Sequence, residues 1–308
     1  MDKIYKYMKF RPEFFKKPSL RVSQRCALND PFEFNPSQDA LDKISEDEIR
    51  DDFFQQISAY STDEEFDDTG VISFTETYNN LLMWSHYADE HKGIVVEFNY
   101  KKLKDHFNKR LSTNNSIERV LYNRERQDML SHSFSPKKSL LTKSDDWIYE
   151  KEHRILTKVS NSDCFVVDIS TYEQMKEFYD DSEMELLQAK KYRGKVKLFV
   201  DMEKCKLMDS RAKDGSSTDD MEEMRFSPSE TVLNELISSV SALPTSIFVF
   251  QIPRNCITGV FIGCRFSDAD KTTLRELLNN KIPCYKASLS KSHFLLDFQY
   301  TNLFYETA

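Results

Sequence analysis

The chain has 308 residues and a formal net charge of −8. Hydrophobic residues make up 39% of it and aromatic residues 13%, which is enough to fill a core and excludes wholesale disorder. With 6 Gly and 9 Pro, the chain is neither collagen-like nor a glycine-rich linker.

The first of the predicted elements is a short strand at the N-terminus, and strands and helices then follow one another without strict alternation. The predicted strands are at residues 3–8, 19–23, 71–75, 94–98, 119–122, 152–159, 165–169, 195–200, 247–252, 257–262, 283–288 and 294–298. The predicted helices are at residues 47–60, 81–91, 101–111, 127–141, 171–190, 229–239 and 267–279. This order predicts an α+β fold with a mixed, mainly antiparallel sheet and flanking helices, in a single domain over 1–308.

Two segments lack this regularity. The segment Asn29-Asp30-Pro31 strongly favours a turn, because Asn and Asp side chains hydrogen-bond to nearby backbone groups and Pro31 disfavours a helical conformation at Asp30. Residues 208–226 are polar and mixed in charge, which predicts a mobile loop.

Targeting and metal-binding signals are absent from the sequence. No stretch approaches the roughly 20 apolar residues of a membrane helix, and residues 1–10 lack the apolar part of a signal peptide. The six cysteines form no C-x-x-C pair, so we expect reduced thiols and no zinc site. These features predict a cytoplasmic protein with no membrane partner and no bound metal.

Charge is distributed unevenly along the chain. Residues 30–68 carry fourteen acids and two bases, a pattern more typical of a solvated face than of a functional surface. The rest of the chain is net +4, and its mildly basic residues 101–158 suit an anionic ligand. This excess of bases is too small to indicate binding of duplex nucleic acid.

An aromatic-rich helix is the first candidate for chemistry. It carries Trp84, His86, Tyr87 and His91. The two histidines are five residues apart, about 140° round the helix axis, so they cannot share one metal ion. We expect His91 to face inward and Tyr87 to line a cleft, whereas plain core packing of the aromatic rings is the alternative.

The second candidate is a cluster of charges in the predicted strand near residue 150. Because side chains alternate along a strand, Glu150, Glu152 and Arg154 would project from one face. Trp147 and Tyr149 flank them, which favours a ligand-lined cleft. A solvated face on which Arg154 neutralises Glu152 is the alternative.

The third candidate is the N-terminal strand, where Tyr5 and Tyr7 share a face near the turn at residues 29–33. These residues suit a pocket for a base or ring, and ordinary edge packing is the alternative. No glycine-rich phosphate loop and no G-x-S-x-G motif occurs anywhere in the chain.

Taken in order, these motifs resemble the bacterial family called domain of unknown function 2971. The motifs that carry the resemblance are Tyr5-Lys6-Tyr7, Leu28–Glu33, Ser73–Glu76, Met83–Ala88, His91–Gly93 and Trp147-x-x-Glu150-x-Glu152-x-Arg154, followed by Ile257–Gly263. The likeness covers residues 3–158 and 244–298. It implies that residues 160–243 are an expansion within the domain, and the family name implies no established activity.

The same order is also similar to that of ADP-ribosyltransferases, which implies a cleft in a split sheet with NAD as a candidate substrate. In that family the late Glu of Glu-x-Glu engages the nicotinamide ribose and supports an oxocarbenium-like transition state. Carried over, Glu152 has that role, Glu150 orients the acceptor, and Ser73 and Thr75 match the middle strand. The substrate-binding set implied is Tyr5, Tyr7, Ser73, Thr75, Trp84, Tyr87, His91 and Arg154. The first strand departs from the pattern, because Tyr5-Lys6-Tyr7 stands where Arg or His is expected.

The resulting expectation is a nucleotide-directed transferase or glycohydrolase, acting on a nucleotide-like small molecule with a protein or nucleic-acid acceptor. Bacterial domains of this kind are often toxins or anti-phage defence effectors, a role that the resemblance implies here. A non-enzymatic sensor or partner-binding module of a defence system is the rival. A metal-dependent nuclease using Glu97 and Glu150 is a third reading, which no spacing supports.

Overall fold

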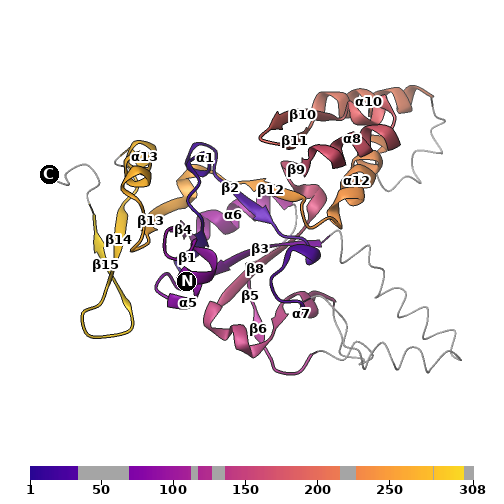
Figure 1. Cartoon of the computed structure of the whole chain (residues 1–308). Coiled ribbons are helices and arrows are strands. Elements are labelled where there is room, and N and C mark those ends of the chain that lie inside the picture. The colour runs from indigo at the N-terminus through magenta and orange to yellow at the C-terminus, as the bar shows by residue number, and fades with distance from the viewer. Residues whose placement is uncertain (34–68, 112–116, 127–135, 216–226, 280, 302–308) are drawn as a thin grey trace, which may run out of the picture.

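The structure is a computed structural model that describes residues 1–33, 69–111, 117–126, 136–215, 227–279 and 281–301. Its described part contains two larger sheets and a two-stranded one, with helices packed around them (Figure 1). Helices and strands mix in the order expected, so the α+β class with a mixed, mainly antiparallel sheet is confirmed.

The larger sheet has eight strands, and β1 lies inside it between β3 and β4. Its strands in spatial order are β15 (Leu296–Tyr300), β14 (Cys284–Leu289), β13 (Ile257–Ile262), β4 (Ile94–Asn99), β1 (Lys3–Met8), β3 (Thr69–Thr75), β8 (Glu152–Lys158) and β5 (Glu118–Arg119). Every neighbouring pair is antiparallel except β13 and β14. The first five residues of β4 are all buried, as expected for a strand covered on both faces.

Different helices cover the two faces of this sheet. Helix α5 (Leu81–Tyr87) buries Met83 and Trp84 against Tyr5, Tyr7 and Val95 on one face. On the opposite face, the apolar side of α6 (Tyr100–Leu111) packs in the same cluster as Ile4, Val96 and Phe98. Alternation along β1 therefore sends Tyr5 and Tyr7 toward α5 and Ile4 and Met8 toward α6.

The second sheet has five strands and packs on the α6 side of the first. Its order is β10 (Leu187–Tyr192), β11 (Lys195–Val200), β9 (Cys164–Asp168), β12 (Ile247–Gln251) and β2 (Ser19–Val22). Its apolar side chains, including Phe165 and Phe248, join the same buried cluster as Ile4 and Phe98 of the first sheet. Residues 160–243, expected as an expansion, thus supply three strands of a sheet that β2 and β12 complete.

Short elements complete the described part. The remaining helices are α1 (Pro12–Lys16), α7 (Pro136–Leu140), α8 (Ile169–Phe178), α9 (Asp181–Met184), α10 (Met202–Gly215), α12 (Pro228–Ser241) and α13 (Asp268–Leu278). The 3-10 helices are η1 (Arg25–Ala27), η2 (Asp145–Glu150), η3 (Val159–Asn161) and η4 (Arg254–Cys256). Strands β6 (Leu121–Tyr122) and β7 (Thr142–Lys143) form the small parallel sheet.

The aromatic-rich helix is shorter than predicted. Asn80 caps it, with its side chain accepting a hydrogen bond from the Met83 amide at 3.1 Å. The prediction that it continues to His91 is wrong, because α5 ends at Tyr87. Asp89, Glu90 and His91 then have φ angles of 50°, 54° and 67°, in the left-handed region.

Three further element predictions differ from the structure. The single helix at 171–190 is wrong, because α8 and α9 are followed there by strand β10. The first eight residues of the expected loop at 208–226 lie in α10, and 216–226 lie outside the described residues. The predicted helix at 47–60 and residues 127–135 of the predicted helix at 127–141 also lie outside the described residues. Of that second helix, α7 covers only 136–140.

Each of the six cysteines is a free thiol. Among the described helices, none combines the length and the apolar character that crossing a bilayer requires.

Candidate functional site

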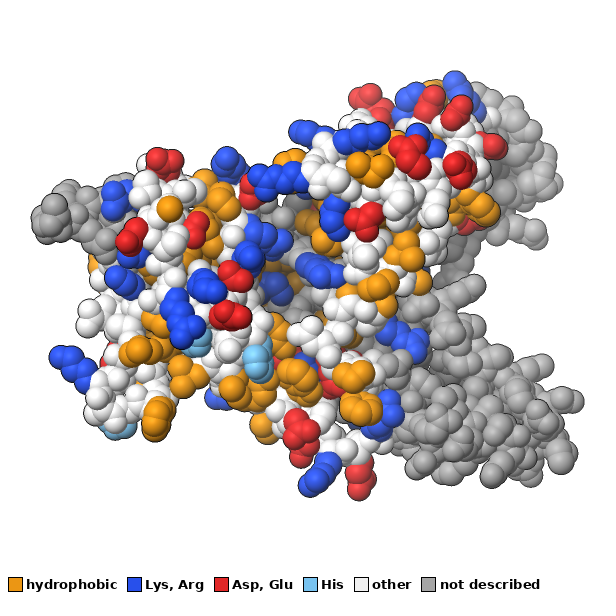
Figure 2. All heavy atoms as spheres, viewed as in Figure 1, with side chains coloured by type: hydrophobic (Ala, Val, Ile, Leu, Met, Phe, Trp, Pro, Cys, Tyr) orange, Lys and Arg blue, Asp and Glu red, His pale blue; other side chains and the backbone are white. Residues whose placement is uncertain are grey.

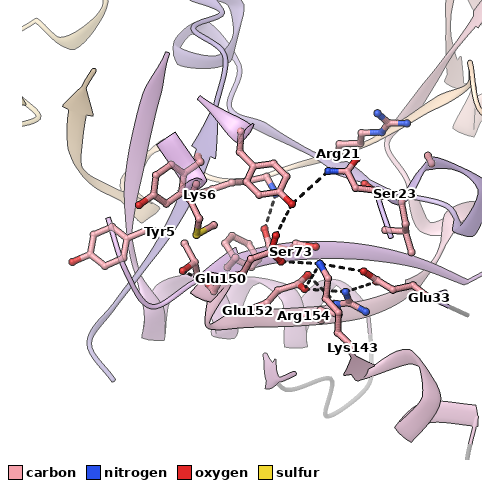
Figure 3. A pocket seen from close by; sticks show the side chains of 18 residues that line it. Tyr5, Lys6, Arg21, Ser23, Glu33, Ser73, Lys143, Glu150, Glu152 and Arg154 are labelled. Carbon is pink, nitrogen blue, oxygen red and sulfur yellow. Dashed lines mark hydrogen bonds and ion pairs between the residues drawn. The ribbon is translucent and has the colours of Figure 1, made fainter. Parts of the chain in front are cut away.

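A cavity of about 240 Å³ lies where strands β1 and β3 separate (Figure 3). The two strands pair at one register position, Tyr5 opposite Thr75. Further along β3, Val71 instead exchanges backbone hydrogen bonds of 2.8 and 2.9 Å with Ser23, just after β2. Because the sheet is split there, residues from both faces of β1 reach a single cavity.

The lining comes from four parts of the chain that are distant in sequence. The described residues that line the cavity are Tyr5, Lys6, Tyr7, Arg21, Ser23, Ala27, Leu28, Asn29, Glu33, Ser73, Phe74, Thr75, Met83, Tyr87, Lys143, Glu150, Glu152 and Arg154. The turn at residues 29–33 forms as the sequence predicted, with the Phe32 amide donating to Asp30 Oδ1 at 2.9 Å. This turn brings Glu33 to the cavity.

Strand register places the central polar residues together. Ser73 pairs with Arg154 and Thr75 with Glu152 across β3 and β8, so all four side chains share one face of the sheet. The expectation that Glu150 belongs to the same strand is wrong, because Glu150 ends the 3-10 helix η2.

A left-handed residue brings Glu150 to the cavity by another route. Lys151 has φ of 44° and turns the chain sharply between η2 and β8. The turn is tied to the end of β3, because Thr75 Oγ1 donates to the Glu150 carbonyl at 2.6 Å. Both Glu150 and Glu152 therefore line the same cavity although a turn separates them.

Arg154 is the centre of a buried charge network (Figure 3). Its guanidinium donates to both carboxylate oxygens of Glu152 at 2.9 Å, and to Glu33 and the Leu140 carbonyl. Only 1% of Arg154 is exposed. A charge in such a place persists only when partners satisfy it, as these do.

Lys143 holds the carboxylates from the other side. Its Nζ lies 2.7 Å from Glu150 Oε2, 3.1 Å from Glu33 Oε1 and 3.6 Å from Glu152 Oε2. It also lies over the Trp147 ring, 4.5 Å from the centroid. Two cations and three carboxylates thus form one connected cluster beneath the cavity.

The two glutamates of the Glu-x-Glu motif have opposite electrostatic environments. Burial acts to raise the pKa of the Glu152 carboxyl, but Arg154 and Lys143 outweigh it and lower that pKa to about 2. Burial raises the pKa of the Glu150 carboxyl above its ordinary value, and the negative charge of Glu152 raises it further. Lys143 and Tyr87 act in the opposite direction but do not cancel this rise. Glu152 therefore stays ionised, while Glu150 is the better proton acceptor of the two.

Two tyrosine hydroxyls fix the glutamates in place. Tyr87 Oη donates to Glu150 Oε1 at 2.5 Å and accepts from the Asn29 side chain at 3.4 Å. Tyr122 Oη accepts from the Glu152 amide at 2.7 Å. Burial raises the pKa of Tyr122 to about 12, so this phenol remains a neutral partner.

Eight of the ten predicted site residues line this cavity, namely Tyr5, Tyr7, Ser73, Thr75, Tyr87, Glu150, Glu152 and Arg154. Trp84 and His91 lie elsewhere. Trp84 is fully buried, its indole donates to the Tyr78 carbonyl at 2.8 Å, and its ring stacks on that of His91. His86 is exposed, as expected for the histidine on the other side of the helix.

Four charged lining residues were not predicted as site residues: Lys6, Arg21, Glu33 and Lys143. Glu33 and Lys6 stand inside motifs that the sequence singled out, whereas no pattern around Arg21 or Lys143 marks either as buried. Glu97, the second carboxylate of the nuclease reading, is held by Lys3 and Thr258 and is not among the described lining residues. Within the described ranges, no group of three or more His, Cys, Asp or Glu side chains is placed to hold a metal ion.

Comparison with known proteins gives one match. Residues 83–155 match the model of a family described as a protein of unknown function, DUF2971. The matched segment contains Tyr87, Lys143, Glu150, Glu152 and Arg154, so it supports the family resemblance where the network is densest. No curated protein and no solved structure matches the chain, and the similarity to ADP-ribosyltransferases stays a prediction.

Proposed function

We propose that the protein cleaves a glycosidic bond of a nucleotide-like substrate, as a transferase or glycohydrolase, with NAD as the candidate substrate. One observation carries the proposal: Glu150 and Glu152 line the same cavity with pKa values shifted in opposite directions. Enzymes that act on glycosidic bonds pair two carboxyl groups whose environments separate their roles in this way.

The reaction follows from these two roles. The bond between ribose C1′ and the ring nitrogen breaks, and its electron pair leaves with neutral nicotinamide. The ionised Glu152 stabilises the positive charge that develops on the ribose, because a fixed charge in a dry site acts strongly. Water or an acceptor hydroxyl then bonds to C1′, and Glu150 accepts its proton before releasing it to solvent.

The size of the cavity supports binding of one end of such a molecule. Pockets that enclose a drug-sized ligand typically measure roughly 300–1,000 Å³, more than the 240 Å³ found here. The cavity therefore suits a sugar with one attached group, while the rest of a dinucleotide extends outside. A protein or nucleic-acid acceptor and a role as a cytoplasmic toxin or anti-phage effector complete the proposal, on the strength of the resemblance.

A sensor that binds the same ligand without turnover is the second candidate. It is favoured by the buried cluster itself, because Arg154 and Lys143 already neutralise Glu152 and Glu150. Such fully paired carboxylates can recognise a ligand hydroxyl without reacting. The two candidates differ in whether substrate is consumed.

The test is to incubate the purified protein with NAD, with and without a cell extract, and to follow nicotinamide release and mass-tagged products. Glu152→Gln keeps the shape of the side chain and removes its charge, so it should lower the rate by about 10²-fold or more. Glu90→Gln is the matched control, because Glu90 is an exposed residue paired only with Lys92 among the described residues.

Each outcome distinguishes the candidates. Loss of nicotinamide release in a Glu152→Gln protein that still folds by circular dichroism, with Glu90→Gln activity unchanged, supports the enzyme. NAD binding without any nicotinamide release supports the sensor. A well-folded Glu152→Gln protein with full activity contradicts the catalytic role.

A further inference from the structure

The charges that line the cavity do not balance. Its described lining carries four cations and three carboxylates, the latter being Glu33, Glu150 and Glu152. Lys143 contacts all three carboxylates, and Arg154 also contacts those of Glu33 and Glu152. The other two cations, Lys6 and Arg21, are left without a carboxylate within ion-pairing distance in the described part of the chain.

Lys6 is held by neutral groups. Its ammonium donates to the Ser73 carbonyl at 2.6 Å and lies 5.6 Å from the centroid of the Phe74 ring (Figure 3). Burial lowers the pKa of Lys6 to about 8, and the charges of Arg11 and Arg21 lower it further against the opposing effect of Glu152. An ammonium in this position has room for a further, anionic partner.

Arg21 is the less satisfied of the two. It lines the cavity from β2, and its Nε is buried with no hydrogen-bond partner. Burial also lowers the pKa of its guanidinium, and nearby Arg11 acts in the same direction. A buried donor without an acceptor costs free energy that an anion would recover.

The surrounding surface has the same sign. On the face shown in Figure 2, Lys and Arg side chains gather around a central hollow, with fewer Asp and Glu side chains beside them. Clefts lined with charge of one sign attract ligands of the other sign. The positive charge on this face therefore favours the approach of an anion.

We propose that Lys6 and Arg21 form a binding subsite for a phosphate group at the β1–β2 end of the cavity. Arg presents a planar fork of donors that matches phosphate oxygens, and Lys adds a point charge. The hydroxyl of Ser23, which also lines the cavity, adds a neutral donor. That the phosphate belongs to a nucleotide rests on the proposed function, whereas the anion site itself does not.

Calorimetric titration tests the subsite without any turnover. Inorganic phosphate, ribose 5-phosphate and ribose are titrated at one pH and ionic strength into the wild-type protein and into Arg21→Gln and Lys6→Gln. Each substitution removes a charge-assisted contact, so each should weaken the binding of inorganic phosphate and of ribose 5-phosphate about tenfold or more. Lys9→Gln is the matched control on the adjoining end of β1, because Lys9 is exposed and its charge lies outside the described lining.

The outcomes separate clearly. Weakening in both site variants, with Lys9→Gln within about twofold of wild type, supports the subsite. No phosphate binding by the wild type, equal binding by the site variants, or an equal loss in Lys9→Gln overturns it. Binding of inorganic phosphate but not of ribose 5-phosphate overturns the sugar-phosphate assignment. If Arg21→Gln does not fold, Arg21→Lys, which keeps the positive charge, replaces it in the titration. The subsite then requires that Arg21→Lys binds phosphate and that Lys6→Gln does not.

Discussion

Buried charges set the character of the site at the scale of single residues. Arg154 contacts Glu33, Glu152 and the Leu140 carbonyl at once, so every hydrogen-bonding edge of its guanidinium is directed at an acceptor. A network of this kind costs more to break than it contributes, because removing one member leaves others buried and unpaired. The geometry of Glu152 therefore depends on Glu33, far away in sequence.

The lowered pKa of Glu152 predicts how stability changes in acid. Its folded pKa of about 2 lies below the ordinary value of 4.5, so its contribution is present above pH 4.5 and is lost as the pH falls toward 2. Chemical unfolding at several pH values should show a smaller decline over this window in Glu152→Gln than in the wild-type protein. Equal slopes for the two proteins would show that Glu152 has an ordinary pKa in the folded state.

Sequence patterns reached only part of this chemistry. Alternation along β8 placed Glu152 and Arg154 on one face correctly, because that relation depends on neighbouring residues alone. The burial of Lys143 could not be predicted from the sequence, because it results from the way β7 and η2 pack near the start of β8. Lysine is almost never fully buried unless it is paired, and its partners are set by tertiary structure.

At the scale of elements, the turn at Lys151 determines the separation of the two glutamates. It joins a 3-10 helix to a strand within one residue, which requires a left-handed backbone. Local pattern suggested a continuous strand there, because lysine, unlike Gly, Asn or Asp, does not signal a left-handed turn. The same limitation explains the missed end of α5, where three non-glycine residues adopt positive φ.

Substitution of Lys151 tests this turn. Lys151→Gly and Lys151→Val remove the same charge, but only glycine adopts the left-handed region freely, while a β-branched side chain clashes there. Lys151→Val should be less stable than Lys151→Gly by about 1–2 kcal/mol or more, as measured by urea unfolding. A valine variant as stable as the glycine variant would mean that the turn adopts another conformation.

Propensity misled the assignment of β10 for a physical reason. Leu187–Tyr192 is rich in Gln, Ala and Lys, which favour helix in isolation. The strand is at the edge of the second sheet, and all its residues after Leu187 are exposed. Lysines on an edge strand discourage pairing with other chains. The lysine-rich composition of β10 therefore reflects its place at the edge of the sheet, and it does not indicate a helix.

At the scale of the whole molecule, the two larger sheets share one apolar cluster. Phe165 of β9 stacks on Phe248 of β12 at 5.7 Å, in the same cluster as Phe98 of β4. We therefore expect the two sheets to unfold together, as the prediction of a single domain requires. The single domain was predicted from the order of the elements, which says nothing of how two sheets divide the chain.

Phe165→Ala tests this cooperation. The chain has two tryptophans, so a Trp147→Phe background leaves Trp84 of α5, packed on the first sheet, as the sole tryptophan reporter. Truncating Phe165 in the second sheet should destabilise the protein by about 3–5 kcal/mol. The Trp84 transition should shift by the full amount, and an unshifted Trp84 signal would show that the sheets unfold separately.

The pairing of β2 with β12 has a consequence for the growing polypeptide. Leu20 lies opposite Phe250, so an early strand finds its partner only near the far end of the chain. During synthesis at the ribosome, which makes the N-terminus first, β2 waits unpaired until most of the protein has been translated. Arg21 of this strand and Glu33 beyond it belong to the cavity. We therefore expect the cavity to acquire its complete lining only after β12 has been translated.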